Sequence, residues 1–265
     1  QLIRKKERKA KVINNKLVFV VPFRNVKEYI VQCTTTLLSQ NYKNWVAIFC
    51  DDNSNDGTVE LIPTDDKFII RINGERITAL PNIHNGIVES NLDDDDVICI
   101  LDGDDCLTRA DAMDIINGLY QDDTLLTYGQ YMWPNGAIGH CKPYTREEFL
   151  NLRRGGYWAS HIRTFKYKLY KELIRQDPNL SCYKNKNGEF YTITYDVAIM
   201  TPLMEIAGFD RVKFNPSPVY YYRIHQQNDH FVDPQLQKSV ADEIFAKKSF
   251  QTCENWASYN ISTLR

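Results

Sequence analysis

The first hundred residues alternate short, continuous apolar runs with segments of helical periodicity. The apolar runs span residues 17–22, 45–50, 68–72 and 97–101. Runs of this length, rich in β-branched residues, are typical of strands that are buried on both faces. The helical segments span residues 26–40 and 82–91, with a short one beginning near Thr58. Buried strands separated by helices predict a mainly parallel sheet between two helical layers, which is an α/β/α sandwich.

The second half of the chain mixes the two patterns less regularly. Strands are expected at 124–133 and 219–224, and helices at 146–153, 160–174, 194–207 and 233–252. A polar stretch at 177–189 contains Asn187-Gly188 and predicts a loop. No obvious interdomain linker separates the two halves, so we expect them to belong to one domain.

The composition excludes several classes of protein. A net charge of −2 gives no general basic surface for nucleic acid, and the one basic cluster, Arg4 to Lys11, is expected to be a solvated extension within residues 1–16. No apolar stretch approaches the ~20 residues of a membrane span, and no secretory signal is present. Seven scattered cysteines without a CxxC pair favour a reducing, cytoplasmic location. Because the chain begins at Gln1, we expect it to be an excerpt of a longer polypeptide.

Carboxylates directly follow two of the predicted strands. Asp51-Asp52 comes after the second apolar run and Asp102 to Asp105 after the fourth, while Pro22 to Asn25 follows the first. Parallel strands end at the same edge of a sheet, so these residues are expected to converge there. Converging acids need a divalent cation, a hydroxyl-rich ligand, or plain solvation in a turn. The residues alone leave these three readings open.

Four motifs together resemble those of family-2-type nucleotide-sugar glycosyltransferases of the GT-A fold. They are Val20 to Asn25, Cys50 to Thr58, Leu101 to Asp105 and Tyr195-Asp196, and the second is close to the family's DDxSxDGT form. The resemblance covers roughly residues 17 to 225. It implies a GT-A (Rossmann-like) fold in which residues 17–132 bind the nucleotide sugar and residues 133–265 bind the acceptor.

The same resemblance implies roles in binding the nucleotide. Asp52 would accept a hydrogen bond from the uracil N–H, in a base pocket lined by Pro22, Phe23 and Arg24. Arg24 stands where the family commonly has an aromatic residue, and its guanidinium could stack on the base instead. Asp102, with Gly103 beside it, would contact the ribose hydroxyls.

A divalent cation, Mn²⁺ or Mg²⁺, is implied by the family's DxD motif. Asp104 matches the metal ligand of that motif, and Asp105 is the competing assignment. His225 or His230 could supply a further ligand, although either could equally be a surface histidine. The cation would neutralise charge that builds up on the departing diphosphate.

Residues of the second half are expected to serve the acceptor. Asp196 matches the acid that takes a proton from the attacking hydroxyl; the alternative is an acid favoured by a helix N-terminus. Trp158 and His161, at the start of the helix predicted at 160–174, could bind an acceptor sugar, or they could be a core tryptophan and a satisfied histidine. The family's usual basic residue beside Asn85 is missing unless His84 serves, so a lysine or arginine of the second half could contact the diphosphate.

The expected activity is metal-dependent transfer of a hexose, glucose or galactose, from a UDP-sugar to a hydroxyl acceptor. Gly156 to Phe165 and Met204 to Gly208 resemble a subgroup that includes giant-virus glycosyltransferases acting on collagen-like hydroxylysine, which implies such an acceptor and the host cytoplasm. Alternatives are a polysaccharide or glycolipid acceptor, a nucleotidyltransferase, and a non-catalytic UDP-sugar-binding module. Family members invert, whereas extension of a collagen disaccharide requires retention, so the stereochemistry stays open. A homodimer is compatible with these expectations.

Overall fold

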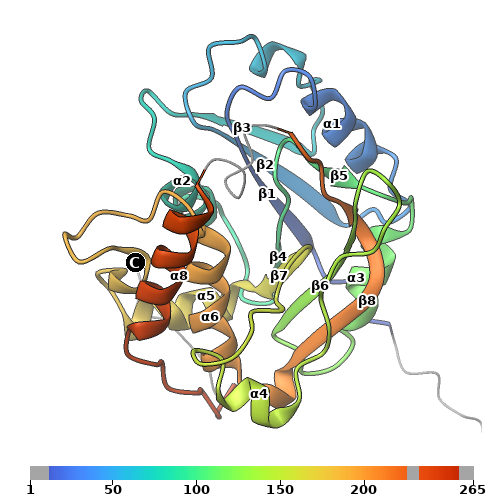
Figure 1. Ribbon diagram of the computed structural model, residues 1–265. Coiled ribbons are helices and arrows are strands. Elements are labelled where there is room, and N and C mark those ends of the chain that lie inside the picture. Colours follow the sequence, from blue (N-terminus) through green and yellow to red (C-terminus); the bar gives the residue numbers. More distant parts are fainter. Residues whose placement is uncertain (1–11, 226–232, 257–265) are drawn as a thin grey trace, which may run out of the picture.

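The computed structural model describes residues 12–225 and 233–256, and Figure 1 shows how its elements are arranged. The strands are β1 (Leu17–Phe23), β2 (Trp45–Asp51), β3 (Phe68–Ile72), β4 (Val97–Ile100), β5 (Cys106–Leu107), β6 (Leu126–Met132), β7 (Arg163–Lys166) and β8 (Val212–Tyr221). The α-helices are α1 (Ile30–Leu38), α2 (Ala79–Val88), α3 (Ala112–Leu119), α4 (Arg146–Leu150), α5 (Tyr167–Gln176), α6 (Tyr195–Ala207) and α8 (Pro234–Ala246). Single 3₁₀ turns occur at Val59–Leu61, Ser181–Tyr183 and Phe209–Arg211.

Within this part of the chain, eight strands form one sheet in the order β3-β2-β1-β4-β7-β6-β8-β5. The pairs β1–β2, β2–β3, β1–β4 and β6–β8 are parallel, whereas β4–β7, β6–β7 and β5–β8 are antiparallel. The sheet therefore runs without interruption from the first half of the chain into the second. The predicted α/β/α sandwich with a mainly parallel sheet is confirmed.

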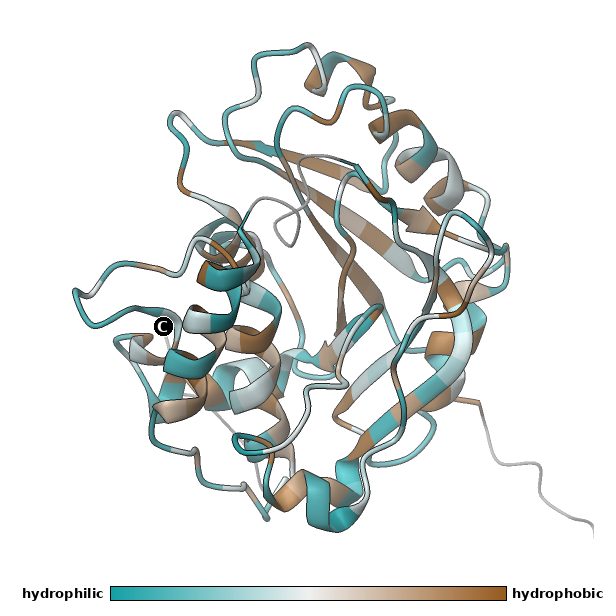
Figure 2. Cartoon of the chain, in the orientation of Figure 1, coloured by the Kyte–Doolittle hydropathy of each residue, from teal (hydrophilic) through white to brown (hydrophobic). Residues whose placement is uncertain are grey.

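Alternate residues of β1 enter two different cores. Val18 and Val20 pack with residues of α2, α5 and α6 on one face, whereas Leu17, Phe19 and Val21 pack with residues of α1 and α3 on the other. Side chains of a strand point alternately to opposite faces, so a fully apolar strand requires a helical layer on both. Figure 2 shows the strands of the sheet as largely apolar and the outer loops as largely polar.

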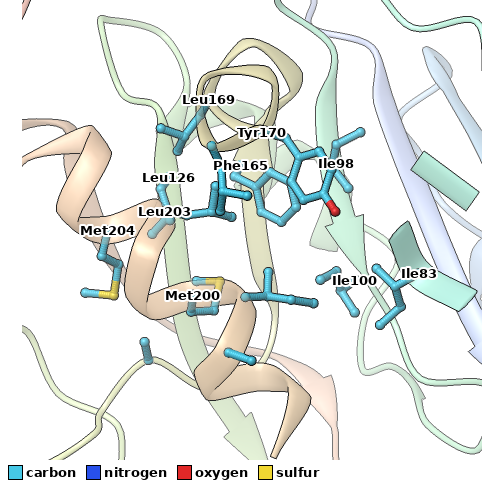
Figure 3. Close-up of a cluster of buried hydrophobic side chains, with 14 of the residues drawn as sticks. Ile83, Ile98, Ile100, Leu126, Phe165, Leu169, Tyr170, Met200, Leu203 and Met204 are labelled. Carbon is cyan, nitrogen blue, oxygen red and sulfur yellow. The ribbon is translucent and has the colours of Figure 1, made fainter. Parts of the chain in front are cut away.

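The first of these cores joins the two halves of the chain. Ile98 and Ile100 of β4 gather with Phe165 of β7 and with Met200 and Leu203 of α6, as Figure 3 shows. All five side chains are buried almost completely. Burying an aliphatic or aromatic side chain of this size contributes about 1.5–3 kcal/mol. The sheet end that carries the acidic turns and the helix that carries Asp196 are thus fixed to one another.

The helix predicted at 160–174 is wrong in its first part. Residues 163–166 form β7, which lies antiparallel between β4 and β6, and the helix begins only at Tyr167. Three of the four residues from Ile162 to Phe165 are β-branched or aromatic, which is typical of a strand, and pairing with two neighbours overrides the helical pattern that follows. Arg163 is therefore a strand residue, and Trp158 and His161 precede a strand rather than open a helix.

Other boundaries differ by a few residues. Strand β8 begins at Val212, seven residues before the predicted start, and the short β5 was not predicted. Helix α8 ends at Ala246 rather than at residue 252. The basic cluster Arg4 to Lys11 and His230 lie outside the described residues. Among the described helices, none is both long enough and apolar enough to cross a membrane.

Candidate active site

A cavity of about 580 Å³ lies at the carboxyl ends of β1, β2 and β4. Most of the predicted site residues line it, namely Pro22, Phe23, Arg24, Asp52, Asp102, Asp104, Asp105, His161, Asp196 and His225. The remaining lining residues include Arg76, Thr78, Tyr131, Trp133, His140, Ser160, Arg163, Tyr195 and Tyr222. The volume is typical of a site for a small molecule or cofactor. Residues separated by up to two hundred positions in the chain thus face one space.

Asp52 anchors the segment that leads into α2. Its carboxylate accepts hydrogen bonds from the backbone N–H groups of Ile77, at 2.6 Å, and Thr78, at 3.0 Å, and it is 5% exposed. Arg24 Nε donates to the backbone carbonyl of Asp52 at 3.2 Å. A carboxylate offers about four acceptor positions, so these bonds leave Asp52 able to accept another donor from the cavity. The neighbouring Asp51 instead accepts from Ser54 and holds the turn.

Gly103 allows the acidic turn after β4 to pass close to the end of β1. Its N–H donates to the carbonyl of Pro22 at 3.0 Å, and a Cβ atom at this position would lie 2.5 Å from Cβ of Phe23. Real Cβ atoms do not approach so closely, so only glycine fits without a shift of the strand end. The glycine brings Asp102 and Asp104 beside the predicted base pocket.

Asp102 and Asp105 form a buried pair of acids supported by tyrosines. The Tyr195 hydroxyl donates to Asp102, whereas the Tyr220 hydroxyl donates to Asp105 Oδ2 at 2.6 Å and lies 3.3 Å from Asp102 Oδ2. Burial raises the pKa of Asp102 to about 6, against the opposing charge of Arg163 and with a further rise from Asp104. Burial and the charges of Asp104 and Asp102 raise the pKa of Asp105 well above its ordinary value. Burial therefore favours the protonated form of both acids, and the charge of Arg163 only partly offsets this for Asp102.

The two candidate metal ligands of the acidic turn differ in their surroundings. Asp104 Oδ2 lies 2.7 Å from His225 Nε2, and both side chains are partly exposed in the cavity. Asp105 is 2% exposed, and its two oxygens accept from the Tyr220 hydroxyl and the Arg223 backbone N–H. A carboxylate and an imidazole that converge on one space are ligands that suit Mn²⁺. The donor set therefore fits a cation held by Asp104 and His225.

A second set of possible ligands contains His161. Donor atoms of Asp102, Asp105 and His161 lie within 4.8 Å of one another. Arg163 Nη2, however, lies 3.1 Å from His161 Nε2, and an arginine can only donate. Burial and the Arg163 charge hold the pKa of His161 well below 6.5, so the ring is neutral and carries its proton on Nδ1. Neither nitrogen is then free to bind a cation, and this set fits a metal less well.

Arg163 lies between the acidic turn and Asp196. It is 3% exposed, its Nη2 atom lies 3.7 Å from Asp196 Oδ2, and its guanidinium lies 5.5 Å from the centre of the Tyr195 ring. Burial lowers the pKa of Arg163, but the surrounding tyrosines and acids more than offset this and raise it. Among the described residues, its Nε and Nη1 atoms have no hydrogen-bond partner. Such buried donors are rare without a ligand or water to satisfy them.

Two predicted residues lie elsewhere. His84 faces away from the cavity, since its Nδ1 atom lies 2.9 Å from the Tyr170 hydroxyl between α2 and α5. Trp158 is not among the residues that line the cavity; its ring packs against Lys142 instead, with Nζ 4.7 Å from the ring centre. Sequence reasoning also did not identify Arg163 or the supporting Tyr220 as site residues. The strand pattern around Arg163 could have revealed a basic residue at a strand end.

Comparison with known proteins identifies the family. The model of the family described as glycosyl transferase family 2 matches residues 18–179, which is more than half of the chain. The chain belongs to glycosyltransferase family 2. It is therefore a glycosyltransferase, an enzyme class that uses nucleotide-sugar donors, and the expected family and GT-A fold are confirmed. The narrower resemblance to glycosyltransferases that act on collagen-like hydroxylysine stays a prediction.

Individual relatives agree with the family 2 assignment. "Glycosyltransferase GlyG" of Streptococcus pneumoniae serotype 4 is 27% identical over 234 residues, which cover 71% of this chain and 76% of that protein. TarS of S. aureus in complex with UDP-GlcNAc has a TM-score of 0.60 at 13% identity, over 85% of this chain and 64% of that one. PcManGT, a mannosyltransferase of Pyrobaculum calidifontis in complex with GDP-Man and Mn²⁺, has a TM-score of 0.55 at 15% identity, over 81% and 59%. The chain spans about three fifths of these solved structures, whose likeness supports the fold.

Proposed function

We propose that this enzyme transfers a hexose from a UDP-sugar to a hydroxyl acceptor and that a divalent cation assists the transfer. The observation that carries the proposal is that Asp52, Asp104 and Asp196 line the same cavity. They come from the ends of β2 and β4 and from the first turn of α6. Complexes of the solved relatives with UDP-GlcNAc, and with GDP-Man and Mn²⁺, support a nucleotide-sugar donor and a cation.

Asp52 is proposed to recognise the uracil base. An ionised carboxylate only accepts hydrogen bonds, so it favours a base that presents an N–H group. The two backbone N–H groups of Ile77 and Thr78 hold Asp52 in one orientation before a ligand binds. Pro22, Phe23 and Arg24 would form the rest of the base pocket, and Asp102 would contact the ribose.

Asp104 and His225 are proposed to hold Mn²⁺ or Mg²⁺. Their donor atoms converge in the cavity, whereas Asp105 is occupied by Tyr220 and Arg223. A cation bound there would neutralise negative charge on the diphosphate leaving group. A cation beside Asp102 and Asp105 would also favour their ionised forms, which burial disfavours.

Asp196 is proposed to act as the general base. In the transfer, the acceptor oxygen forms a bond to C1 of the donor hexose while the bond from C1 to the phosphate oxygen breaks. The acceptor proton passes to Asp196, and UDP departs with the bonding electrons. Arg163 gives Asp196 a buried counter-charge and lines the same cavity, and its Nε and Nη1 atoms have no hydrogen-bond partner among the described residues.

The donor sugar and the acceptor are proposed from the resemblance of residues 156–165 and 204–208 to the collagen-modifying subgroup. We propose glucose or galactose as the hexose and a hydroxylysine, or the sugar attached to it, as the acceptor. A panel of acceptors that includes a hydroxylysine peptide, a galactosyl-hydroxylysine peptide, a polysaccharide and a glycolipid would test this part separately.

The decisive experiment measures UDP release from a panel of UDP-sugars and GDP-mannose, with Mn²⁺, Mg²⁺ or EDTA. We expect UDP to be released from UDP-glucose or UDP-galactose, and we expect this release to depend on the cation. Asp52→Asn should weaken the binding of UDP by about tenfold, because it removes a charge-assisted hydrogen bond. Turnover that persists in EDTA would contradict the role of the cation. Failure to bind UDP would contradict the proposal as a whole.

A further inference from the structure

The side of the cavity contributed by the second half of the chain is lined by aromatic rings. We define the aromatic wall as Tyr131, Trp133, His140, His161 and Tyr222, all of which line the cavity. The Trp133 ring lies 5.1 Å from Tyr131 and 5.2 Å from Tyr222, and Tyr222 lies 5.1 Å from His161. His140 meets Tyr131 at 5.9 Å. The five rings thus form one connected cluster, in which Tyr131 and His161 are almost completely buried.

Backbone contacts fix the aromatic wall in place. Trp133 N–H donates to the Ala137 carbonyl at 2.8 Å, and Tyr222 N–H donates to the Met132 carbonyl at 2.9 Å. The Tyr131 hydroxyl is hydrogen-bonded to His140 Nδ1 at 2.9 Å. A Cβ atom at position 139 would collide with the Tyr131 ring, so Gly139 lets the returning chain pass directly over it. A surface fixed in advance loses little entropy when a ligand binds.

The aromatic wall adjoins Asp196, the proposed general base. His161 contacts Arg163, and Arg163 in turn lies 3.7 Å from Asp196. The proposed nucleotide pocket instead comes from the ends of β1 and β2 and from the segment before α2. A ligand on the aromatic wall would therefore approach Asp196 from the side opposite the proposed nucleotide pocket.

We propose that the aromatic wall binds a pyranose ring of the acceptor, so that the acceptor is a sugar rather than a free amino-acid side chain or a lipid alcohol. This inference rests on the proposed function. One face of a pyranose presents C–H groups that pack on aromatic rings, while its hydroxyls lie at the edge. The Tyr131 hydroxyl, His140 and Ser160 offer polar partners there.

The charge of the aromatic wall also favours a neutral ring. Burial and Arg163 hold the pKa of His161 well below its ordinary range, and burial raises the pKa of Tyr131 to about 12. Both side chains are therefore neutral at pH 7. A hydroxyl of the bound pyranose would attack C1 of the donor and pass its proton to Asp196, with release of UDP.

The test compares acceptors and variants with UDP-glucose and UDP-galactose in Mn²⁺. Methyl glucoside and methyl galactoside are expected to stimulate UDP release, whereas free hydroxylysine and glycerol at equal concentration are not. Trp133→Ala should raise the acceptor KM by about tenfold and Trp133→Phe by about threefold, as the loss of an aromatic contact predicts. The donor KM, measured at saturating acceptor, should change less than the acceptor KM in both variants. Phe190→Ala, which removes a half-buried ring that packs on Lys184, is the control and should leave all rates unchanged.

Each outcome has a defined meaning. Equal use of glycerol, hydroxylysine and methyl glycosides would overturn the inference, as would an unchanged acceptor KM in Trp133→Ala. A rise in the donor KM, with the acceptor KM unchanged, would assign the aromatic wall to the donor sugar and also overturn it. If Trp133→Ala does not fold, the acceptor KM and donor KM of Trp133→Phe test the inference instead. Loss of UDP binding in the wild type would instead contradict the proposed function itself.

Discussion

Replacing Tyr220 by phenylalanine removes one hydroxyl from the acidic cluster and keeps the ring. Tyr220 is fully buried, its hydroxyl donates to Asp105 at 2.6 Å and lies 3.3 Å from Asp102, and its ring stacks on His161 at 4.4 Å. A hydrogen bond to a charged group contributes about 1.5–3 kcal/mol. Since the ring contacts survive the substitution, we expect Tyr220→Phe to lower the free energy of unfolding by about 2 kcal/mol at pH 8.

The size of this loss should depend on pH. A hydroxyl that donates to a carboxylate stabilises its ionised form, so its removal raises the pKa of Asp102 and Asp105. The pKa of Asp102 is about 6 in the folded protein, so this acid is largely protonated at pH 5 and ionised at pH 8. A protonated acid gains less from the same donor, and the loss at pH 5 should therefore fall below about 1 kcal/mol.

Urea unfolding followed by circular dichroism, in EDTA at pH 5 and pH 8, measures both values. Tyr128→Phe is the matched control, because Tyr128 is also buried and its hydroxyl donates to the neutral carbonyl of Lys142 at 2.9 Å. It should lose about 1 kcal/mol at both pH values. Equal losses for Tyr220→Phe at pH 5 and pH 8, or a pH dependence no larger than that of the control, would refute the inference that the Tyr220 hydroxyl acts on acids that ionise between these two pH values.

Three further predictions concern stability. Because the pKa of Asp102 is raised from 3.8 to about 6 on folding, its contribution to the free energy of unfolding is fully present below pH 4 and is lost as pH rises through about 6. This shift in pKa corresponds to about 3 kcal/mol. We expect urea unfolding in EDTA to show the loss and Mn²⁺ to reverse it. Gly103→Ala should cost about 1–3 kcal/mol in urea unfolding and weaken UDP binding in calorimetry, because the new Cβ meets Phe23. Arg153→Met should lower the free energy of unfolding by about 3–5 kcal/mol in the same assay, because it leaves Glu205 buried without its partner. The two side chains form a largely buried bidentate pair, with Arg153 Nε 2.6 Å from Glu205 Oε1 and Arg153 Nη2 2.8 Å from Glu205 Oε2. A loss under 1 kcal/mol would contradict this.

The sequence was sufficient to predict the parts of the fold and site that depend on local pattern. Strands β1, β2 and β4 are continuous apolar runs, and each ends at a turn whose polar residues are adjacent in the chain. Parallel strands bring their carboxyl ends to one edge, so the convergence of Asp52 with Asp102 and Asp104 followed from the predicted parallel sheet. The α/β/α layers followed from the same runs.

Features that depend on distant partners could not be predicted in this way. The strand at Arg163 exists because β4 and β6 lie on either side of it, and they belong to segments about 65 and 40 residues earlier in the chain. The different surroundings of Asp104 and Asp105 depend on Tyr220 and Arg223, which follow more than a hundred residues later. Side chains that meet only through the folded sheet leave no local pattern in the sequence.

The most direct test of the account compares UDP binding with turnover in Asp196→Asn. Asp196 lines the cavity near Arg163 but comes from α6, whereas the proposed nucleotide pocket is formed by β1, β2 and the segment before α2. Calorimetry should therefore give a Kd for UDP within about twofold of the wild type, while kcat for sugar transfer falls about 10²–10⁴-fold. Turnover close to that of the wild type would contradict the central claim that Asp196 is the base for glycosyl transfer in this cavity.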